Sequence, residues 1–129
     1  MTGATILVVE DNSLNAKLVR DVLQHAGYEV LEAETGEEGL RVARERRPDL
    51  VLMDLQLPGI DGTEALRRLR ADESTRRIPV MAVTASAMAA DRADAVRAGF
   101  DAFVEKPISV RALPDRVASL LSERGGGDG

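Results

Sequence analysis

Five short runs of apolar residues recur along the chain, and they are continuous rather than alternating with polar residues. Three of them are rich in β-branched residues, and such runs are typical of strands that are covered on both faces of a parallel sheet. The second run alternates more, which indicates a strand nearer the edge of the sheet. The predicted strands are Ile6–Val9, Val30–Ala33, Leu50–Met53, Val80–Val83 and Ala102–Val104.

Between these runs, apolar residues recur at the spacing of amphipathic helices. The first helix is predicted from Leu14 to Gly27, which acts as a helix stop. Thr35 followed by Glu38 is a capping-box pattern, and it opens a second helix through Ala43. Two more helices are predicted over residues 62–72 and 87–98, the latter ending at Gly99.

Ser109 is predicted to cap a last helix that continues through Leu121. Pro114 falls in the second turn of that helix, so we expect the helix to start late or to bend. Strands and helices thus alternate five times, which predicts an α/β domain with one parallel sheet, helices on both faces and right-handed crossovers. We assign this domain to residues 4–123 and a flexible glycine-rich tail to residues 124–129.

The composition excludes several classes of protein. The chain has 129 residues and no cysteine, which excludes disulfides, zinc fingers and thiol catalysis. The net charge of −5 and the scarcity of aromatic residues argue against a nucleic-acid partner. No segment reads as a signal peptide, and no apolar stretch approaches the roughly 20 residues that span a membrane. We therefore expect a cytoplasmic protein without a membrane partner.

Polar side chains follow four of the five predicted strands. Glu10 and Asp11 follow the first strand, Asp54 the third and Thr84 the fourth, and Lys106 comes shortly after the fifth. Because the carboxyl ends of parallel strands meet at one edge of a sheet, we expect these side chains to lie together. Three carboxylates within roughly 5 Å repel one another by about 3 kcal/mol per pair at an effective dielectric near 20. A magnesium ion and Lys106 would relieve this repulsion.

This set of groups suits phosphoryl chemistry. Asp54, on the central run, can act as a nucleophile and form an aspartyl phosphate. A metal ion and Lys106 would neutralise the oxygens of the transferred group, and Thr84 could donate its hydroxyl to another oxygen. Taken singly, each residue also fits an ordinary strand end or turn, and Asp11 with the two residues after it could simply cap the first helix.

Four segments carry a resemblance to a known family. They are "ILVVEDN" (Ile6–Asn12), "LVLMDLQLPGIDG" (Leu50–Gly62), "PVMAVTA" (Pro79–Ala85) and "AGFDAFVEKP" (Ala98–Pro107). With these motifs in order, the chain resembles the receiver domains of response regulators, in particular stand-alone receivers of the DivK kind and receivers of hybrid kinases. The resemblance implies a three-layer, doubly wound (βα)5 flavodoxin-like fold with strand order 2-1-3-4-5, an order that receiver proteins exemplify.

The resemblance implies a metal ion beside the phosphoacceptor. Asp54 would accept the phosphoryl group. Mg²⁺, for which Mn²⁺ could substitute, would be held directly by Asp11, Asp54 and the backbone carbonyl of Gln56. Glu10 would act on the ion through a water molecule.

The resemblance also implies roles for residues near the end of the chain. Thr84 and Lys106 would bind phosphate oxygens, and the Lys106–Pro107 peptide bond would be cis. Phe103 would swing inward as Thr84 moves toward the phosphoryl group. Alternatively, Phe103 merely packs at the edge of the sheet.

By the same resemblance, the phosphoryl donor is a histidine kinase or a histidine phosphotransfer protein. The domain would catalyse only its own phosphorylation and dephosphorylation, as a monomer or weak dimer. No effector domain follows Leu121, so we expect the output to be a protein contact on the face of the fourth helix, fifth strand and fifth helix. The candidate contacts for the donor are Leu14, Asn15, Leu18 and Ile108.

Three alternatives to a receiver domain stay open. An aspartate-nucleophile phosphohydrolase would need a second acid two residues after its nucleophile, where this chain has Gln56. A nucleotide- or flavin-binding module would need a loop rich in glycine, serine or threonine after the first strand, where this chain has Glu10, Asp11 and Asn12. The third alternative is a domain that only binds partners and whose site is idle.

Overall fold

Five parallel strands form one sheet, as the apolar runs predict. The computed structural model describes residues 3–85 and 99–126, and the helix predicted over residues 87–98 lies outside these ranges. The elements are β1 (Thr5–Val9), α1 (Ser13–His25), β2 (Glu29–Ala33), α2 (Gly36–Arg46), β3 (Leu50–Asp54), α3 (Gly62–Ala71), β4 (Val80–Thr84), β5 (Ala102–Glu105) and α5 (Leu113–Gly126). The strand order is β2-β1-β3-β4-β5, which confirms the predicted topology.

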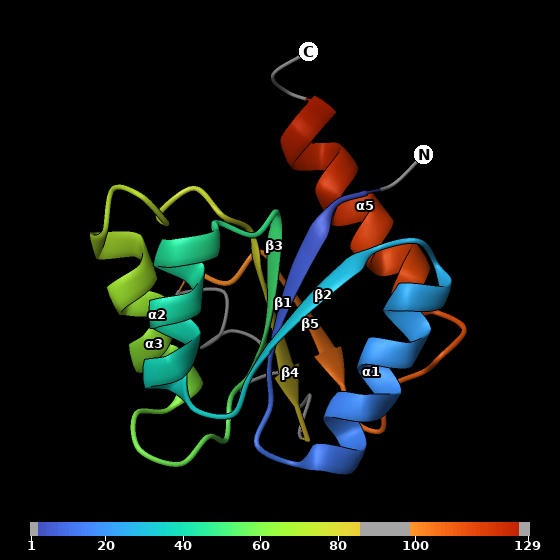
Figure 1. The fold of residues 1–129 in the computed structure, drawn as a ribbon, viewed down its shortest axis with the longest axis horizontal. Coiled ribbons are helices and arrows are strands. Elements are labelled where there is room, and N and C mark those ends of the chain that lie inside the picture. Colours follow the sequence, from blue (N-terminus) through green and yellow to red (C-terminus); the bar gives the residue numbers. More distant parts are fainter. Residues whose placement is uncertain (1–2, 86–98, 127–129) are drawn as a thin grey trace.

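The sheet lies between two layers of helices, with α1 and α5 on one face and α2 and α3 on the other (Figure 1). β3, at the centre of the sheet, is buried along its whole length. Neighbouring residues of a strand point to opposite faces. Val9 therefore enters the core beneath α2 and α3, whereas Val8 enters the core beneath α1 and α5. None of the helices in the described part of the chain is long and apolar enough to cross a membrane.

A polar side chain caps each of the first three helices. Oδ1 of Asn12 accepts two N–H groups from the first turn of α1, each at 3.0 Å. Oγ1 of Thr35 accepts the N–H of Glu38 at 3.0 Å, which confirms the predicted start of α2. At the start of α3, Oδ1 of Asp61 accepts the N–H of Glu64 at 2.9 Å. Asn12, and not Asp11, therefore caps α1, which leaves the carboxylate of Asp11 available to the acid cluster.

The last helix differs from the prediction at both ends. α5 begins at Leu113, and Ser109 lies in a preceding turn where its Oγ accepts the N–H of Ala112 at 3.2 Å. The predicted cap at Ser109 is therefore wrong, whereas the late start is confirmed. Pro114 falls in the first turn of α5, where a missing N–H and a fixed φ are favourable. α5 continues to Gly126, so residues 124–126 of the predicted tail are helical.

Candidate functional site

The parallel register brings the candidate residues to one edge of the sheet. It places Glu10, just after β1, beside Asp54 at the end of β3. Thr84 at the end of β4 is in register with Glu105 of β5, so Lys106 follows at the same edge. We call this the carboxyl edge, and its site residues are Glu10, Asp11, Asp54, Thr84 and Lys106.

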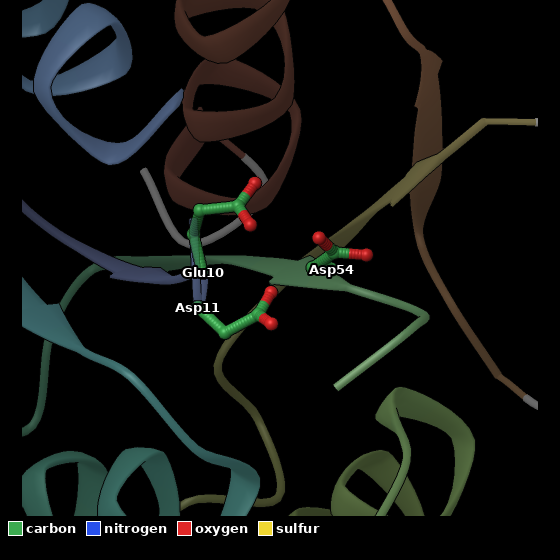
Figure 2. Close-up of side chains that lie close together, drawn as sticks. All are labelled: Glu10, Asp11 and Asp54. Carbon is green, nitrogen blue, oxygen red and sulfur yellow. The ribbon is translucent and has the colours of Figure 1, made fainter. Parts of the chain in front are cut away.

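Glu10, Asp11 and Asp54 form a cluster of three carboxyl groups (Figure 2). One oxygen of each residue lies within 4.8 Å of the corresponding oxygens of the other two. The side chains of Glu10 and Asp54 are 5% and 4% exposed, whereas Asp11 is exposed. Buried carboxylates at such separations repel one another strongly, so a cation bound among them is favoured.

One lysine reaches this cluster from the end of β5. Nζ of Lys106 donates to Oδ2 of Asp54 at 2.7 Å and lies 3.4 Å from Oε1 of Glu10. Burial opposes the charged form of Lys106, but the hydrogen bond to Asp54 and the charges of both acids outweigh it and raise the pKa of the lysine. Burial, together with the adjacent Asp54, raises the pKa of Glu10. The two buried carboxyl groups thus share the ammonium group of Lys106.

Backbone N–H groups fix the orientation of the two buried carboxylates. The N–H of Gln56 donates to Oδ1 of Asp54 at 2.9 Å. The N–H of Asn12 donates to Oε2 of Glu10 at 3.0 Å. A carboxylate oxygen that accepts one hydrogen bond keeps a further lone pair, so both groups can still bind a metal ion.

The other predicted site residues, Gln56, Thr84 and Phe103, have different environments. Gln56 lies in the turn after β3, and its side chain is exposed. Thr84 is half-buried, and its carbonyl oxygen accepts the N–H of Lys106 at 2.7 Å. Phe103 is half-buried and packs against the core beneath α2 and α3. The peptide bond between Lys106 and Pro107 is cis, in agreement with the resemblance.

The donor set of the carboxyl edge fits a hard divalent cation. The clustered ligand atoms are all carboxylate oxygens, which Mg²⁺ and Mn²⁺ prefer. The strands hold Glu10 and Asp54 in place, while the exposed Asp11 leaves the cluster open to solvent. The acidic cluster could therefore hold a metal ion that also keeps water or phosphate ligands.

The predicted contact residues on α1 lie beside the carboxyl edge. Leu14 and Leu18 are 77% and 41% exposed, although both are large and apolar. Asn15 is half-buried, and its N–H donates to the Asn12 cap. Leu14 lines a groove of about 580 Å³ that reaches Glu10. Exposed leucines at this place form a surface that a partner can cover.

Two apolar residues, Ile108 and Val110, follow β5 before the last helix begins. Ile108 is half-buried and lines a small cavity together with Glu10 and Asp54. Val110 is 46% exposed, although its sequence pattern gives no sign of this. The helical spacing of apolar residues after Ser109 assigns Val110 to the last helix, whereas the structure places it in the turn before α5.

Known proteins with the same sequence pattern and fold are receiver domains. The family model described as "Response regulator receiver domain" matches residues 6–118. The polar-differentiation response regulator DivK of Brucella anthropi is 44% identical over 119 residues, which cover 92% of this chain and 97% of that protein. The receiver domain of sensor histidine kinase PA1611 from Pseudomonas aeruginosa was crystallised with magnesium in its active site cleft. It matches with a TM-score of 0.82 and 35% identity, over 97% of this chain and 99% of that one. The Mn²⁺-bound form of response regulator Rcp1 matches with a TM-score of 0.75 and 26% identity, over 92% of each chain.

Proposed function

This chain belongs to the response regulator receiver domain family, and we propose that Asp54 is its phosphoacceptor. A phosphoacceptor function is consistent with that family. The observation that carries the assignment is the setting of Asp54, a buried carboxylate at the end of the central strand. It lies 2.7 Å from Nζ of Lys106 and in one cluster with Glu10 and Asp11.

We propose that the acid cluster holds Mg²⁺, with Mn²⁺ as a substitute. Asp11, Asp54 and the backbone carbonyl of Gln56 would bind the ion directly, and Glu10 would bind it through a water molecule. When bound, the ion supplies positive charge for the phosphoryl oxygens and relieves the repulsion among the acids. The all-oxygen donor set and the exposure of Asp11 support this assignment.

The proposed donor is a phosphohistidine on a histidine kinase or a histidine phosphotransfer protein. An oxygen of the Asp54 carboxylate attacks the phosphorus, and the new P–O bond forms as the P–N bond breaks. The electron pair of the P–N bond leaves with the imidazole nitrogen. Lys106 holds one phosphoryl oxygen as a compact charge, and the hydroxyl of Thr84 donates to another. The domain in this way catalyses its own phosphorylation, and water later hydrolyses the acyl phosphate.

Phosphorylation is proposed to signal through a protein contact. Thr84 and Phe103 are the two residues expected to change position, and the output surface includes β5 and α5. The exposed Leu14 and Leu18, with Asn15 and Ile108, are proposed to contact the phosphoryl donor. The cytoplasmic location and the monomeric or weakly dimeric state stay predictions.

Intact mass after treatment with acetyl phosphate and Mg²⁺ tests the assignment. The wild-type protein is expected to gain one phosphate, and Asp54→Asn is expected to gain none. Asp21→Asn is the matched control, because Asp21 is an exposed aspartate on α1 and should leave the gain unchanged. An equal gain on Asp54→Asn, or no gain on the wild-type protein, would overturn the proposal.

A further inference from the structure

Gly62, the first residue of α3, approaches the end of β3 too closely for any side chain. A Cβ atom built on Gly62 would lie 2.6 Å from the carbonyl oxygen of Asp54 and 2.9 Å from Cα of Leu55. Both contacts are to backbone atoms, which cannot rotate away as the end of a side chain can. An alanine at position 62 therefore has to displace either α3 or the end of β3.

The backbone that Gly62 touches is also the backbone that orients the site. The N–H of Gly62 donates to the carbonyl oxygen of Leu55 at 3.2 Å, and the N–H of Leu55 donates to Val83 of β4 at 3.0 Å. The next residue, Gln56, holds Oδ1 of Asp54 through its own N–H. A shift at Leu55 would thus reach Asp54 and Gln56 together.

The loop between β3 and α3 is confined from its other side by α2. A Cβ atom built on Gly36, at the start of α2, would lie 2.7 Å from Cγ1 and 3.1 Å from the carbonyl oxygen of Ile60. Gly62 and Gly36 therefore lie at two close contacts of the loop, one against backbone and one mainly against a side chain. The backbone contact at Gly62 is the more rigid of the two.

We propose that Gly62 is a positioning residue of the metal site. Because it has no side chain, Gly62 lets the end of β3 lie close to α3. This contact fixes the positions of the Asp54 carboxylate and the Gln56 backbone relative to Asp11. This inference rests on the proposed function, because the ligands it positions are those proposed for Mg²⁺. Residues that orient metal ligands typically contribute about 10- to 100-fold to metal affinity.

Titration of the unphosphorylated protein with MgCl₂, followed by calorimetry, tests the inference. We expect Gly62→Ala to raise the Kd for Mg²⁺ by about tenfold or more. Gly36→Ala should raise it by less, because the Ile60 side chain can partly yield. Gly99→Ala is the control. At φ +105° an alanine is strained, but among the described residues the nearest atom to its Cβ would be Cδ2 of Leu66 at 3.7 Å, so the fold is weakened away from the site.

The outcomes separate this inference from the proposed function. If the wild-type protein binds Mg²⁺ and a folded Gly62→Ala variant binds it equally well, the inference is overturned while the metal site stands. If circular dichroism shows that Gly62→Ala does not fold, the Kd of Gly36→Ala for Mg²⁺ decides. A raised Kd supports the inference, and an unchanged Kd overturns it. If Gly99→Ala weakens Mg²⁺ binding as much as Gly62→Ala, general destabilisation explains the loss and the inference fails. If the wild-type protein binds no Mg²⁺, the metal site itself is refuted, and the inference with it.

Discussion

The two edges of the sheet hold their charged groups in opposite ways. At the amino edge, where β4 and β5 begin, Arg70 pairs with Asp101 at 2.8 Å, and the same carboxylate oxygen accepts the N–H of Val80. Other N–H groups of the Arg70 guanidinium donate to the carbonyl oxygens of Arg76, Ile78 and Gly99. Among the described residues, the charge of Arg70 is thus paired with a carboxylate, and backbone carbonyl groups accept its other hydrogen bonds.

At the carboxyl edge, Glu10, Asp11 and Asp54 lie together, and the ammonium group of Lys106 pairs with Asp54 and Glu10. Within residues 3–85 and 99–126, no arginine or second lysine forms an ion pair with these three acids. The contrast teaches that an edge with balanced charge stabilises the fold, whereas an edge with excess negative charge gains most when a cation and a phosphoryl group arrive.

The largest expected effect is on Lys106. Lys106→Met should lower the initial rate of phosphorylation by acetyl phosphate by about 100-fold or more. The reason is that the variant lacks the positive charge proposed to bind an oxygen of the transferred phosphoryl group. Lys106→Arg should restore little of this rate, since a planar guanidinium cannot replace a compact ammonium beside two buried acids. A wild-type rate for Lys106→Arg, measured by intact mass over time, would contradict this account of the carboxyl edge.

The amino edge should respond in stability alone. Arg70→Met is expected to lower the free energy of unfolding by about 1–3 kcal/mol, because the Asp101 carboxylate and several carbonyl groups lose a charged donor. Urea denaturation measures the change, and Arg76→Met at the exposed neighbouring position is the control. Mg²⁺ affinity should be the same in both variants. A weaker Mg²⁺ affinity in Arg70→Met would show that the two edges are not independent.

Glu10 should make the carboxyl edge sensitive to pH. Its pKa is raised in the folded protein, mainly by burial, so the folded state holds this proton at pH values where the unfolded state has lost it. Stability should therefore fall as pH rises from the ordinary carboxyl pKa through the raised one. Thermal unfolding without metal should show that Glu10→Gln removes this fall and stabilises the protein at pH 7.

Two further results would complete the Glu10 experiment. Glu10→Gln should also weaken Mg²⁺ binding, because the carboxylate proposed to bind the ion through a water molecule becomes a neutral amide. Glu29→Gln, at the exposed start of β2, should leave both the pH profile and the metal affinity unchanged. A Glu10→Gln variant that is less stable than the wild-type protein at pH 7 would refute the sign of this argument.

The smallest effect is expected on the surface of α3. Nε of Arg67 and Nε of Arg68 donate to the Glu64 carboxylate at 3.0 Å and 2.8 Å, and these bonds lower the pKa of Glu64 to about 2. The stability from this group is present above the ordinary carboxyl pKa and is lost as pH falls toward 2. Glu64→Gln should lower the Tm slightly at pH 7 and not at pH 2. Equal shifts at both pH values would contradict this assignment.

The sequence was sufficient to place the carboxyl edge but not the amino edge. Glu10, Asp54 and Lys106 each lie at the carboxyl end of a strand. Parallel strands bring these ends together irrespective of the conformation of the loops. Arg70 could not be predicted, because its partners come from the segments before β4 and before β5, and their positions depend on the tertiary path of the chain. A glycine at position 62 indicates a turn, but its close contact with the backbone of β3 across a loop leaves no signal in the sequence.

Ser109 shows a different reason for a wrong prediction. A serine followed by apolar residues at helical spacing matches a cap, and the sequence offers the same pattern whether a helix or a single turn follows. Pro114 decides between them, because it is tolerated only in the first turn of the helix. The helix therefore begins at Leu113, and Ser109 closes the turn before it.

The central claim is that the carboxyl edge exists to place a phosphoryl group on Asp54. The most direct test is to treat the protein with acetyl phosphate and Mg²⁺, reduce the acyl phosphate with borohydride, and locate the resulting homoserine by peptide mass mapping. We expect homoserine at residue 54, and we expect it only in protein that was phosphorylated in the presence of Mg²⁺. Homoserine at residue 11, or the absence of any converted residue in protein that carries one added phosphate, would contradict this claim.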